Sequence, residues 1–557
     1  MRVLTRWDGE FSTGETNEIL QTVALTLSKR IQNERMREVI VSLLGTSDFR
    51  ALCDLDFNYA DLSVADALTI RQILALYSKR ADLDFGVDRR AVSFCTFKEA
   101  ERLCSETNQI FRMHGRGGFL FPPRVESVLF MAQRKISRIL GEVPTLEQLP
   151  FRFGPGATTN VRKADACSRL KLSRRLQCSE DLLPVVSSLL EEMPAWIPFT
   201  EESETAMVDV EIRPSKLCFV PKTAKTDRAI ATEPVLNTMY QAGIGQYMAE
   251  RLRLNGIDIK DQSKNQRLAR EGSLTGALAT LDLSNASDTL ATEFVYHMLP
   301  IDWFLLLDHG RTTFIDTPEG ILLQQKFSSM GNGFTFPLET LLFYSLAWAS
   351  VEALCEGHEE KTVSVYGDDI IIPTYAYDLL STVLHCVGCV VNHKKSFKDG
   401  PFRESCGADY LSGINIRPFY LKNELTCSDL FVMHNAFYRH GDNEVCEILV
   451  QYVHEPLRIY GPDGYGDGHL LGEWIPKPHK RRAGWAGYTF STFTFRTRKK
   501  YRALPGDYVY PAYSVYVSSC SPKRSSGFSL YSQTGELGDI LPGVNGYKRI
   551  EIYTLEC

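Results

Sequence analysis

The most informative stretch of this sequence is Val363-Ser364-Val365-Tyr366-Gly367-Asp368-Asp369-Ile370-Ile371-Ile372. Runs rich in β-branched residues flank a Gly-Asp turn, a pattern typical of a tight β-hairpin. The adjacent carboxylates of Asp368 and Asp369 cannot be buried without a partner, because an isolated buried charge is very costly. A hard divalent cation, which prefers oxygen ligands, would provide that partner. The alternative is an ordinary exposed turn, so the interpretation depends on the rest of the chain.

The composition of the chain limits the classes of protein to which it can belong. The 557 residues are 44% hydrophobic and 23% charged, which predicts a soluble globular protein of two or three subdomains. The net charge of −6 excludes a global basic field, so a nucleic-acid site has to be a local patch. The spacing of the 14 cysteines does not suggest a set of disulfide bonds, which favours a reducing compartment. Cys386 and Cys389 are interpreted as thiols of the hydrophobic core. The most apolar stretch, residues 340–355, is too short for a bilayer and carries Glu352, so we expect no membrane part.

The pattern of residues changes along the chain. The first ~210 residues are expected to be mainly helical, with apolar residues at helical spacing in 17–28 and 65–78. Residues 210–235 are β-like and basic, and residues 276–425 carry most of the chemistry. Beyond residue 425 a helical stretch is followed by a tail rich in aromatic residues, Gly and Pro.

A second pair of carboxylates lies in Ala279-Thr280-Leu281-Asp282-Leu283-Ser284-Asn285-Ala286-Ser287-Asp288. Its start predicts a buried strand, and Asp282 between two leucines requires a partner. Asp288 is expected to open a helix over residues 289–298, and a plain N-cap is the alternative interpretation of this residue.

A glycine-containing loop, Ser328-Ser329-Met330-Gly331-Asn332-Gly333-Phe334-Thr335, precedes a helix expected over residues 338–356 and stopped by Gly357. Glycines allow the backbone to approach a ligand closely. A simple loop before a core helix is the alternative.

Two groups of basic residues complete the pattern. Lys222, Lys225 and Arg228 recur every three residues and would neutralise phosphates, unless they form only a solvated basic edge. Lys394 or Lys395 could donate a proton to a leaving group, unless they are a surface pair. With two divalent cations held by the aspartates, these groups define one reaction: attack of a 3′-hydroxyl on an α-phosphate, with the triphosphate held by the basic cluster.

The order of these five elements resembles motifs F, A, B, C and D of viral RNA-directed RNA polymerases. The sequence is most similar to the replicase β subunits of single-stranded RNA bacteriophages of the Qβ type. The resemblance covers residues 150–425 and is carried by Asp282-Leu283-Ser284, Ala286-Ser287-Asp288, Met330-Gly331-Asn332-Gly333, Tyr366-Gly367-Asp368-Asp369, Gly400-Pro401-Phe402-Arg403-Glu404-Ser405-Cys406-Gly407, Pro418-Phe419-Tyr420 and Gly256-Ile257-Asp258.

The resemblance implies a fold and a division of the chain. The fold class is mixed α+β: a right-hand polymerase with fingers, palm and thumb and an antiparallel palm sheet. Residues 1–275 would form mainly an N-terminal extension and fingers, residues 276–425 mainly the palm, and residues 426–557 the thumb with a basic aromatic C-terminal region.

The resemblance also implies roles for individual residues. Two Mg²⁺ ions, for which Mn²⁺ or Ca²⁺ could substitute, would be bound by Asp282, Asp368 and Asp369 together with Leu283. Asp288 resembles the residue that reads the ribose 2′-hydroxyl, and Lys394 or Lys395 resembles the general acid, without a choice between them. The other implied nucleotide-binding residues are Lys222, Lys225, Arg228, Ser329, Gly331, Asn332 and Thr335. One departure concerns Glu339, where broader viral polymerases have an Asn that supports the ribose-reading Asp; two carboxylates could repel each other there.

RNA contacts are predicted in two places. One is a separate loop near residue 155, which contains Gly154 and Gly156. The other is the tail from residue 474 to 506, which has nine Lys/Arg and no acidic residue, with aromatic residues interleaved. Arg481, Arg482, Arg498, Lys499 and Lys500 are its candidate contacts, and a solvated face of the thumb is the alternative.

The resemblance further implies partners: single-stranded RNA as template and product, ribonucleoside triphosphates, host elongation factors Tu and Ts, and a large ribosomal protein. The expected location is the cytoplasm of the infected bacterial host. A reverse transcriptase would place a bulky aromatic residue where Ser287 and Asp288 stand. An RNA-binding scaffold derived from an inactive polymerase is disfavoured, because such a protein would have lost its carboxylates first. A P-loop enzyme is also disfavoured, because the chain contains no P-loop motif.

Overall fold

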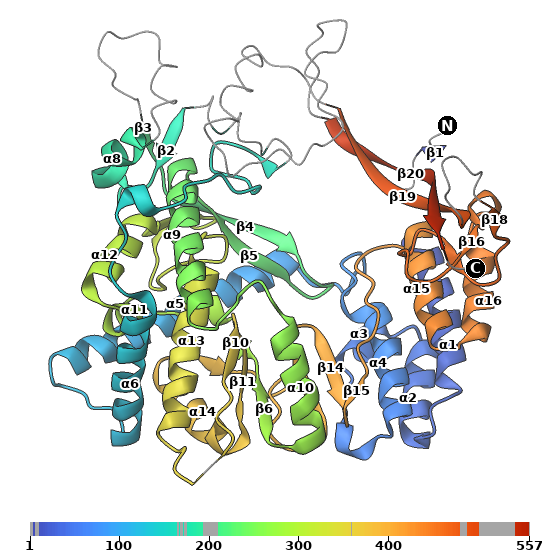
Figure 1. Cartoon of the computed structure of the whole chain (residues 1–557), viewed down its shortest axis with the longest axis horizontal. Coiled ribbons are helices and arrows are strands. Elements are labelled where there is room, and N and C mark those ends of the chain that lie inside the picture. Colours follow the sequence, from blue (N-terminus) through green and yellow to red (C-terminus); the bar gives the residue numbers. More distant parts are fainter. Residues whose placement is uncertain are drawn as a thin grey trace, which may run out of the picture.

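The computed structural model describes residues 4–5, 11–163, 166, 171, 175–192, 210–357, 359–478, 487–500 and 541–555; for residues 4–5, 495–500 and 541–548 it describes the backbone alone. The chain forms a smaller helical lobe and a larger mixed lobe side by side (Figure 1). Within these described ranges, no helix has the length and apolar character needed to cross a membrane.

The smaller lobe combines the two ends of the described chain (Figure 1). Its N-terminal part is α1 (Thr13–Ser28), α2 (Glu34–Gly45), α3 (Phe49–Asp54) and α4 (Val64–Ser78), and its C-terminal part contains α15 (Cys427–Arg439) and α16 (Asn443–Tyr452). A capping box between Ser12 and Glu15 begins α1. The helices predicted over 17–28 and 65–78 are confirmed. Apolar side chains of both parts, such as Ile19 and Leu430, share one hydrophobic core.

The larger lobe is built around α13 (Thr335–Glu352), whose side chains are buried on nearly every face. This helix begins three residues before the predicted start, because Pro337 is tolerated in a first turn. It ends before Glu356, the predicted last residue. The helices around it are α5 (Arg89–Gly115), α6 (Pro123–Leu140), α8 (Val186–Glu191), α9 (Val235–Leu254), α10 (Ser263–Thr275), α11 (Thr292–Met298), α12 (Ile301–Gly310) and α14 (Tyr377–Cys386).

A three-stranded antiparallel sheet lies beside α13, in the order β10-β11-β6. Its strands are β6 (Leu278–Leu281), β10 (Ser364–Tyr366) and β11 (Asp369–Pro373). Tyr366 pairs with Asp369, so Gly367 and Asp368 form the tip of the hairpin, and Gly367 has a φ of 60°. The predicted tight hairpin is confirmed. Ile370 pairs with Leu281, and this register places Asp369 opposite Asp282 at the end of β6.

Other sheets surround this centre. A four-stranded sheet has the order β5-β4-β8-β9 and contains β4 (Ser215–Pro221), β5 (Asp227–Thr232), β8 (Phe314–Thr317) and β9 (Gly320–Leu323). Another contains β13 (Phe402–Ser405), β14 (Ala408–Leu411) and β15 (Ile414–Asn415). The paired short strands are β7 (Leu283–Ser284) with β12 (Val390–Val391), β2 (Leu176–Cys178) with β3 (Val210–Ile212), and β16 (Tyr460–Gly461) with β17 (Leu470–Leu471).

A long ribbon of β19 (Tyr488–Lys500) and β20 (Leu541–Thr554) rises from the smaller lobe (Figure 1). Its outer neighbours are β1 (Leu4–Thr5) and β18 (Lys477–Pro478). The stretch after residue 425 therefore begins with helices, as predicted, and continues as strands.

Glu233, directly after β5, is a buried carboxyl whose pKa is raised to about 7 by burial, although Thr312 and Gln241 donate hydrogen bonds to it. Because its folded pKa lies above the unfolded value, the stability carried by the protonated form is complete below pH 4.5 and is lost as the pH rises through 7. We expect Glu233→Gln to leave the free energy of unfolding nearly unchanged at pH 5 and to raise it at pH 8, by up to about 3 kcal/mol. Urea unfolding of both chains at the two pH values measures this difference, and an equal effect at both would contradict the assignment.

Candidate active site

Asp282 lies at the end of β6, where a neighbouring segment fixes its backbone and side chain. The Asn392 main-chain N–H donates to the Asp282 carbonyl at 2.9 Å, and the Asn392 side-chain amide donates to Oδ2 at 2.9 Å. The Asp282 N–H donates to Ser396 Oγ at 3.1 Å. The carboxylate is therefore held rigidly in the geometry that a metal ligand requires. Asn392 and Ser396, which supply this support, were not identified from the sequence.

The three aspartates predicted as metal ligands influence one another electrostatically. Burial raises the pKa of Asp368, and the charge of Asp282 raises it further. Burial and then the charge of Asp368 raise the pKa of Asp369 to about 7. Such mutually repelling carboxylates suit a hard divalent cation, which would remove the repulsion. Among the residues that the structure describes, no three acidic, His or Cys side chains stand close enough to form a ready-made metal cage.

Leu283 was predicted as a further metal ligand. Its side chain is buried in the main hydrophobic core, and an aliphatic chain offers no ligand atom. Only the main-chain carbonyl of Leu283 could bind a metal ion, so the prediction for Leu283 is limited to that backbone oxygen.

The glycine loop packs directly on β5. Met330 O accepts from Ala231 N at 2.8 Å. Gly331 has a φ of 114°, and a Cβ there would lie 2.3 Å from the carbonyl oxygen of Ala231, so only glycine fits. The polar side chains of the loop are buried and hydrogen-bonded: Thr335 Oγ1 donates to Ser328 Oγ at 2.8 Å, and Asn332 Oδ1 accepts from Phe334 N at 2.9 Å. Ser329 Oγ donates to Gln324 Oε1, just outside the loop, at 2.7 Å. These residues organise the loop, and their contact with a nucleotide stays a prediction.

Asp288 does not cap a helix. It lies in a short 3₁₀ turn, Ala286–Thr289, after Asn285, whose φ of 54° turns the chain sharply. The helix predicted over 289–298 begins only at Thr292, and its N-cap, Ala291, makes no side-chain cap bond. The predicted start of this helix is therefore wrong, and so is the alternative that Asp288 is an N-cap. The Asp288 carboxylate accepts a hydrogen bond from Lys326 Nζ at 2.7 Å and none from the backbone N–H groups of a following helix.

Glu339, on α13, is the buried acid that departs from the pattern of broader viral polymerases. Burial raises its pKa well above the ordinary value, and the charges of Asp368 and Asp288 raise it further. A raised pKa favours the protonated form, which reduces the carboxylate repulsion that the sequence suggested at this position.

The three basic residues of the predicted triphosphate cradle divide into two groups. Lys222 and Arg228 lie near Asp282 and Asp368: burial and then Arg228 lower the pKa of Lys222, while Asp282 and Asp368 oppose that shift. Lys225 instead forms an ion pair with Asp54 of α3. Lys222 and Lys225 lie in the turn between β4 and β5 rather than on a strand.

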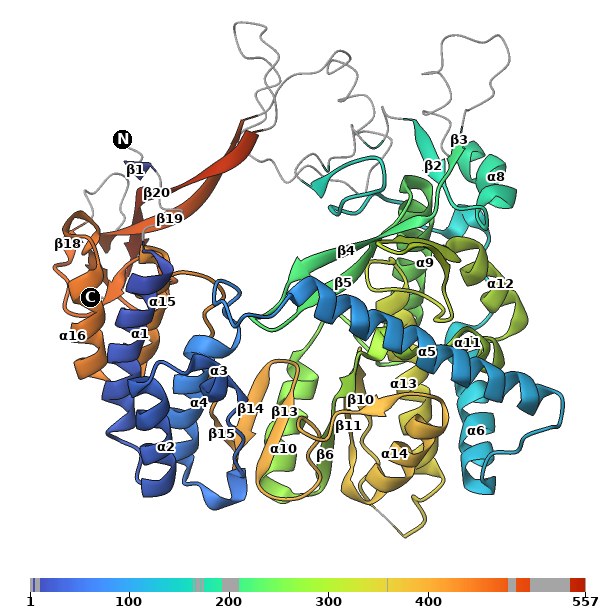
Figure 2. The same cartoon turned by 180° about the vertical axis from the view of Figure 1, so that it is seen from behind.

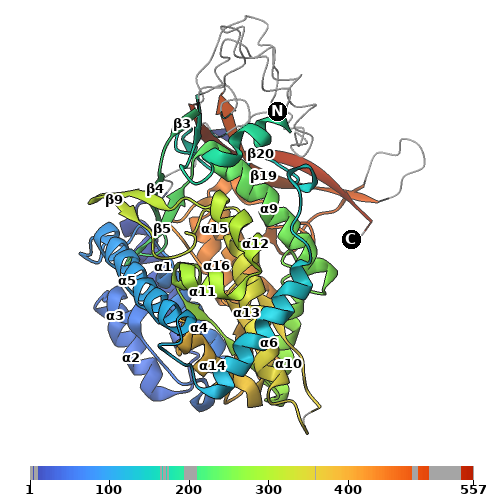
Figure 3. The ribbon, with the colours of Figure 1, turned by 90° about the vertical axis from the view of Figure 1, so that its left-hand side faces the viewer.

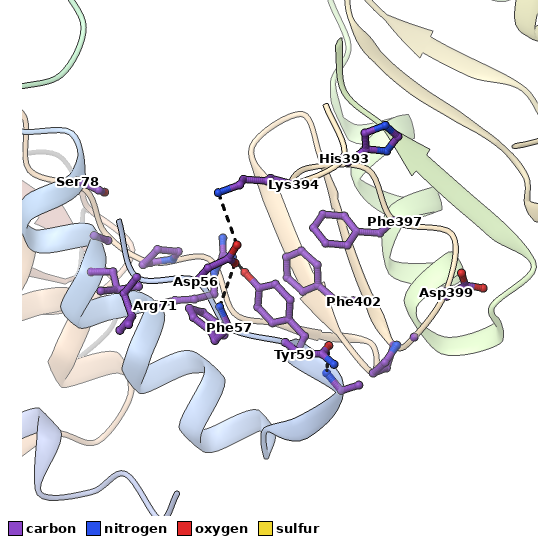
Figure 4. A pocket seen from close by; sticks show the side chains of 18 of the residues that line it. Asp56, Phe57, Tyr59, Arg71, Ser78, His393, Lys394, Phe397, Asp399 and Phe402 are labelled. Carbon is purple, nitrogen blue, oxygen red and sulfur yellow. Dashed lines mark hydrogen bonds and ion pairs between the residues drawn. The ribbon is translucent and has the colours of Figure 1, made fainter. Parts of the chain in front are cut away.

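The adjacent lysines point to different partners. Lys395 Nζ lies 3.6 Å from Asp282 Oδ2. Lys394 Nζ lies 3.6 Å from Asp56 Oδ2, and both of these side chains are largely exposed. Figure 4 shows Lys394 reaching across a pocket toward Asp56, with Tyr59 and Phe402 in its wall. Of these two lysines, only Lys395 therefore faces Asp282.

The predicted RNA contacts are only partly described. Gly154 and Gly156 have open space where a Cβ would be, and Gly154 O accepts from Lys171 Nζ at 2.6 Å. Arg481 and Arg482 lie outside the described residues. Arg498, Lys499 and Lys500 lie on β19, where only the backbone is described.

The acidic hairpin lies beside Asp282, and the glycine loop packs on β5, the strand that follows the basic β4–β5 turn. This is the arrangement expected of a nucleotide-polymerising enzyme. A family model described as RNA replicase, beta-chain, matches residues 22–534. The chain belongs to this family, and it is an RNA-directed RNA polymerase.

Known relatives share most of the chain. The RNA-directed RNA polymerase subunit beta of Escherichia virus Qbeta is 37% identical over 475 residues, which cover 83% of this chain and 78% of that protein. The RNA-directed RNA polymerase beta chain of Enterobacteria phage fr is 31% identical over 416 residues, covering 74% of this chain and 72% of that one. A solved in situ structure of the BmCPV RNA-dependent RNA polymerase covers 58% of this chain and 32% of that one, with 13% identity and a TM-score of 0.35. The predicted mixed α+β class, with an antiparallel sheet that carries the acidic hairpin, is confirmed.

Proposed function

We propose that this chain copies single-stranded phage RNA from ribonucleoside triphosphates, in replication and transcription, by two-metal nucleotidyl transfer with release of pyrophosphate. The observation that carries the proposal is the meeting of Asp282 with the Asp368–Asp369 tip, enforced by the pairing of Ile370 with Leu281. Asp282, Asp368 and Asp369 would hold Mg²⁺, with Mn²⁺ or Ca²⁺ as substitutes. Bound Mg²⁺ supplies activation of the 3′-hydroxyl and stabilisation of charge on the α-phosphate.

The remaining side chains of the site handle the nucleotide. Lys222 and Arg228 bind the triphosphate, because both are cations beside the catalytic carboxylates. Asp288 accepts a hydrogen bond from the ribose 2′-hydroxyl. Lys395 donates the proton to the leaving pyrophosphate, since it faces Asp282 whereas Lys394 faces Asp56.

Metal removal tests the reaction class. The full-length chain is incubated with single-stranded RNA and labelled ribonucleoside triphosphates, with and without an extract of host bacteria. We expect synthesis of RNA that stops with EDTA and returns with excess Mg²⁺ or Mn²⁺, because the carboxylates alone cannot activate the 3′-hydroxyl. Synthesis that continues in EDTA would contradict the two-metal proposal.

The extract tests the proposed partners. By resemblance, these are elongation factors Tu and Ts and a large ribosomal protein in the cytoplasm of the infected host. We expect the extract to raise RNA synthesis on phage templates and the purified factors to replace it. Equal activity with and without the extract would remove the requirement for host subunits.

The basic aromatic tail is the proposed guide for template or product RNA. We expect the combined change Arg498→Glu, Lys499→Glu and Lys500→Glu to weaken RNA binding and to reduce the dependence of log affinity on log salt, because each lost phosphate contact removes about 0.7 from that slope for a single strand. Filter binding at several salt concentrations measures both quantities. Unchanged affinity and slope would leave the tail as a solvated face.

A further inference from the structure

Lys326 is a buried cation directly behind the active site. Its side chain is 1% exposed, and its Nζ lies 2.7 Å from Asp288 Oδ1 and 3.6 Å from Glu101 Oε1. The amine also lies 4.1 Å from the centroid of the Phe97 ring. Burying an ammonium group is costly unless it is paired, so these contacts fix the position of Lys326 and of the carboxylate that it holds.

Helix α5 supports this arrangement from the outside. It crosses one side of the larger lobe beside α11 (Figures 2 and 3). Glu101 Oε2 on this helix accepts from Gln325 N at 2.5 Å. Asn108 on the same helix donates to Gln325 O at 2.8 Å and accepts from Glu293 N at 2.8 Å. The backbone next to Lys326 is thus tied to the same helix that supplies its second carboxylate.

The two oxygens of Asp288 have different environments. Oδ1 accepts from Lys326, while Oδ2 has no hydrogen-bond partner within the described part of the chain. The Asp288 side chain is 17% exposed, whereas Lys326 is 1% exposed, so the carboxylate reaches the site and the amine does not. An ionised carboxylate only accepts hydrogen bonds, which matches a hydroxyl donor.

We propose that Lys326 is the positioning residue for sugar selection: it holds Oδ1 of Asp288, so that Oδ2 is aimed at the ribose 2′-hydroxyl. This inference rests on the proposed role of Asp288. Broader viral polymerases support the ribose-reading Asp with an Asn at the position of the buried Glu339, whereas here Lys326 contacts Asp288. A site built around a substrate hydroxyl rejects an analogue that lacks it, because the buried acceptor is then left unpaired.

The decisive variant is the double change Lys326→Met with Glu101→Gln. It removes one positive and one negative charge, so the net charge of the buried cluster is unchanged while Asp288 loses its holder. We expect the ratio of kcat/KM for ATP to kcat/KM for dATP to fall at least tenfold, toward the ratio of Asp288→Ala. Glu101→Gln alone should keep the wild-type ratio, because Lys326 still holds Asp288.

Arg80→Met is the matched control. Arg80 is a fully buried cation paired with Asp82 in the core of the smaller lobe, so its loss should lower the melting temperature without changing the ratio. An unchanged ratio in the double variant, with a reduced ratio in Asp288→Ala, would overturn the role of Lys326 and leave the proposed role of Asp288 intact. An unchanged ratio in Asp288→Ala would overturn both. A ratio that falls equally in Arg80→Met would reduce the effect to general destabilisation and also overturn the inference.

Discussion

RNA synthesis by the Asp368→Asn chain is expected to fall by about 10³-fold or more. An amide replaces the carboxylate at the hairpin tip, so the site loses a charged oxygen ligand for Mg²⁺. Metal-ion catalysis contributes several kcal/mol to stabilisation of the transition state, and each 1.36 kcal/mol corresponds to a factor of ten. Incorporation of labelled ribonucleotides on single-stranded RNA, at saturating Mg²⁺ and host factors, measures the loss.

The same substitution should not unfold the protein. Burial and Asp282 raise the pKa of Asp368, and Asp368 in turn raises that of Asp369, so removing one charge relieves repulsion in the absence of metal. We expect the melting temperature of Asp368→Asn without metal to equal or exceed that of the wild type. Added Mg²⁺ should raise the melting temperature of the wild type more than that of the variant.

Asp378→Asn is the matched control for this experiment. Asp378 lies in the first turn of α14, its side chain is 79% exposed, and its partner is Lys398 at 2.8 Å. The control should retain full activity and the full response to Mg²⁺. Activity of Asp368→Asn within tenfold of the wild type would refute the proposed metal role of the hairpin.

Replacement of Lys395 by Met is expected to lower kcat by about 100-fold or more, the contribution of a positioned general acid. Burial lowers the pKa of Lys395, but Asp282 and neighbouring acids more than compensate and raise it, so the side chain stays charged and carries a proton to donate. Lys394→Met is the adjacent control and should change kcat little, because Lys394 faces Asp56.

Lys395→Arg distinguishes proton donation from simple charge. Arginine keeps the positive charge but does not release a proton at physiological pH. We expect this variant to bind ribonucleoside triphosphates with a nearly unchanged KM and to show most of the loss in kcat. Pre-steady-state incorporation of a single nucleotide measures the chemical step. A variant as active as the wild type would assign Lys395 an electrostatic role instead, and a larger loss in Lys394→Met would reverse the assignment of the pair.

Local sequence patterns predicted the elements of the site because short-range physics dominates in them. β-branched runs around Gly367-Asp368 predicted the hairpin, and two leucines around Asp282 marked a buried strand end. Local patterns also predicted that Asp288 begins a helix, and this prediction is wrong. The partner of Asp288, Lys326, is 38 positions away in the chain, so local propensity favoured a helix start that the ion pair displaced.

The choice between Lys394 and Lys395 shows the same limit. Adjacent residues of one type are equivalent in a sequence pattern. The backbone near residue 392 is fixed by the bonds from Asn392 to Asp282, and this contact turns one lysine toward the catalytic carboxylates and the other toward the smaller lobe. The division of the chain at residues 275 and 425 stays a prediction, although the first and last parts of the described chain share a hydrophobic core.

The sequence by itself identified the polymerase class and the tight hairpin of Asp368 and Asp369, and it predicted the roles of the glycine loop and the basic turn, because each of these inferences depends on residue types at short spacing. Tertiary structure alone decided three further features: the joining of the chain ends in one lobe, the raised pKa of Glu339, and the contact of Lys326 with Asp288. These depend on burial and on charges that meet across long sequence separations. The energy of a buried charge is set by the partners that surround it in space, and one-dimensional spacing carries no information about them.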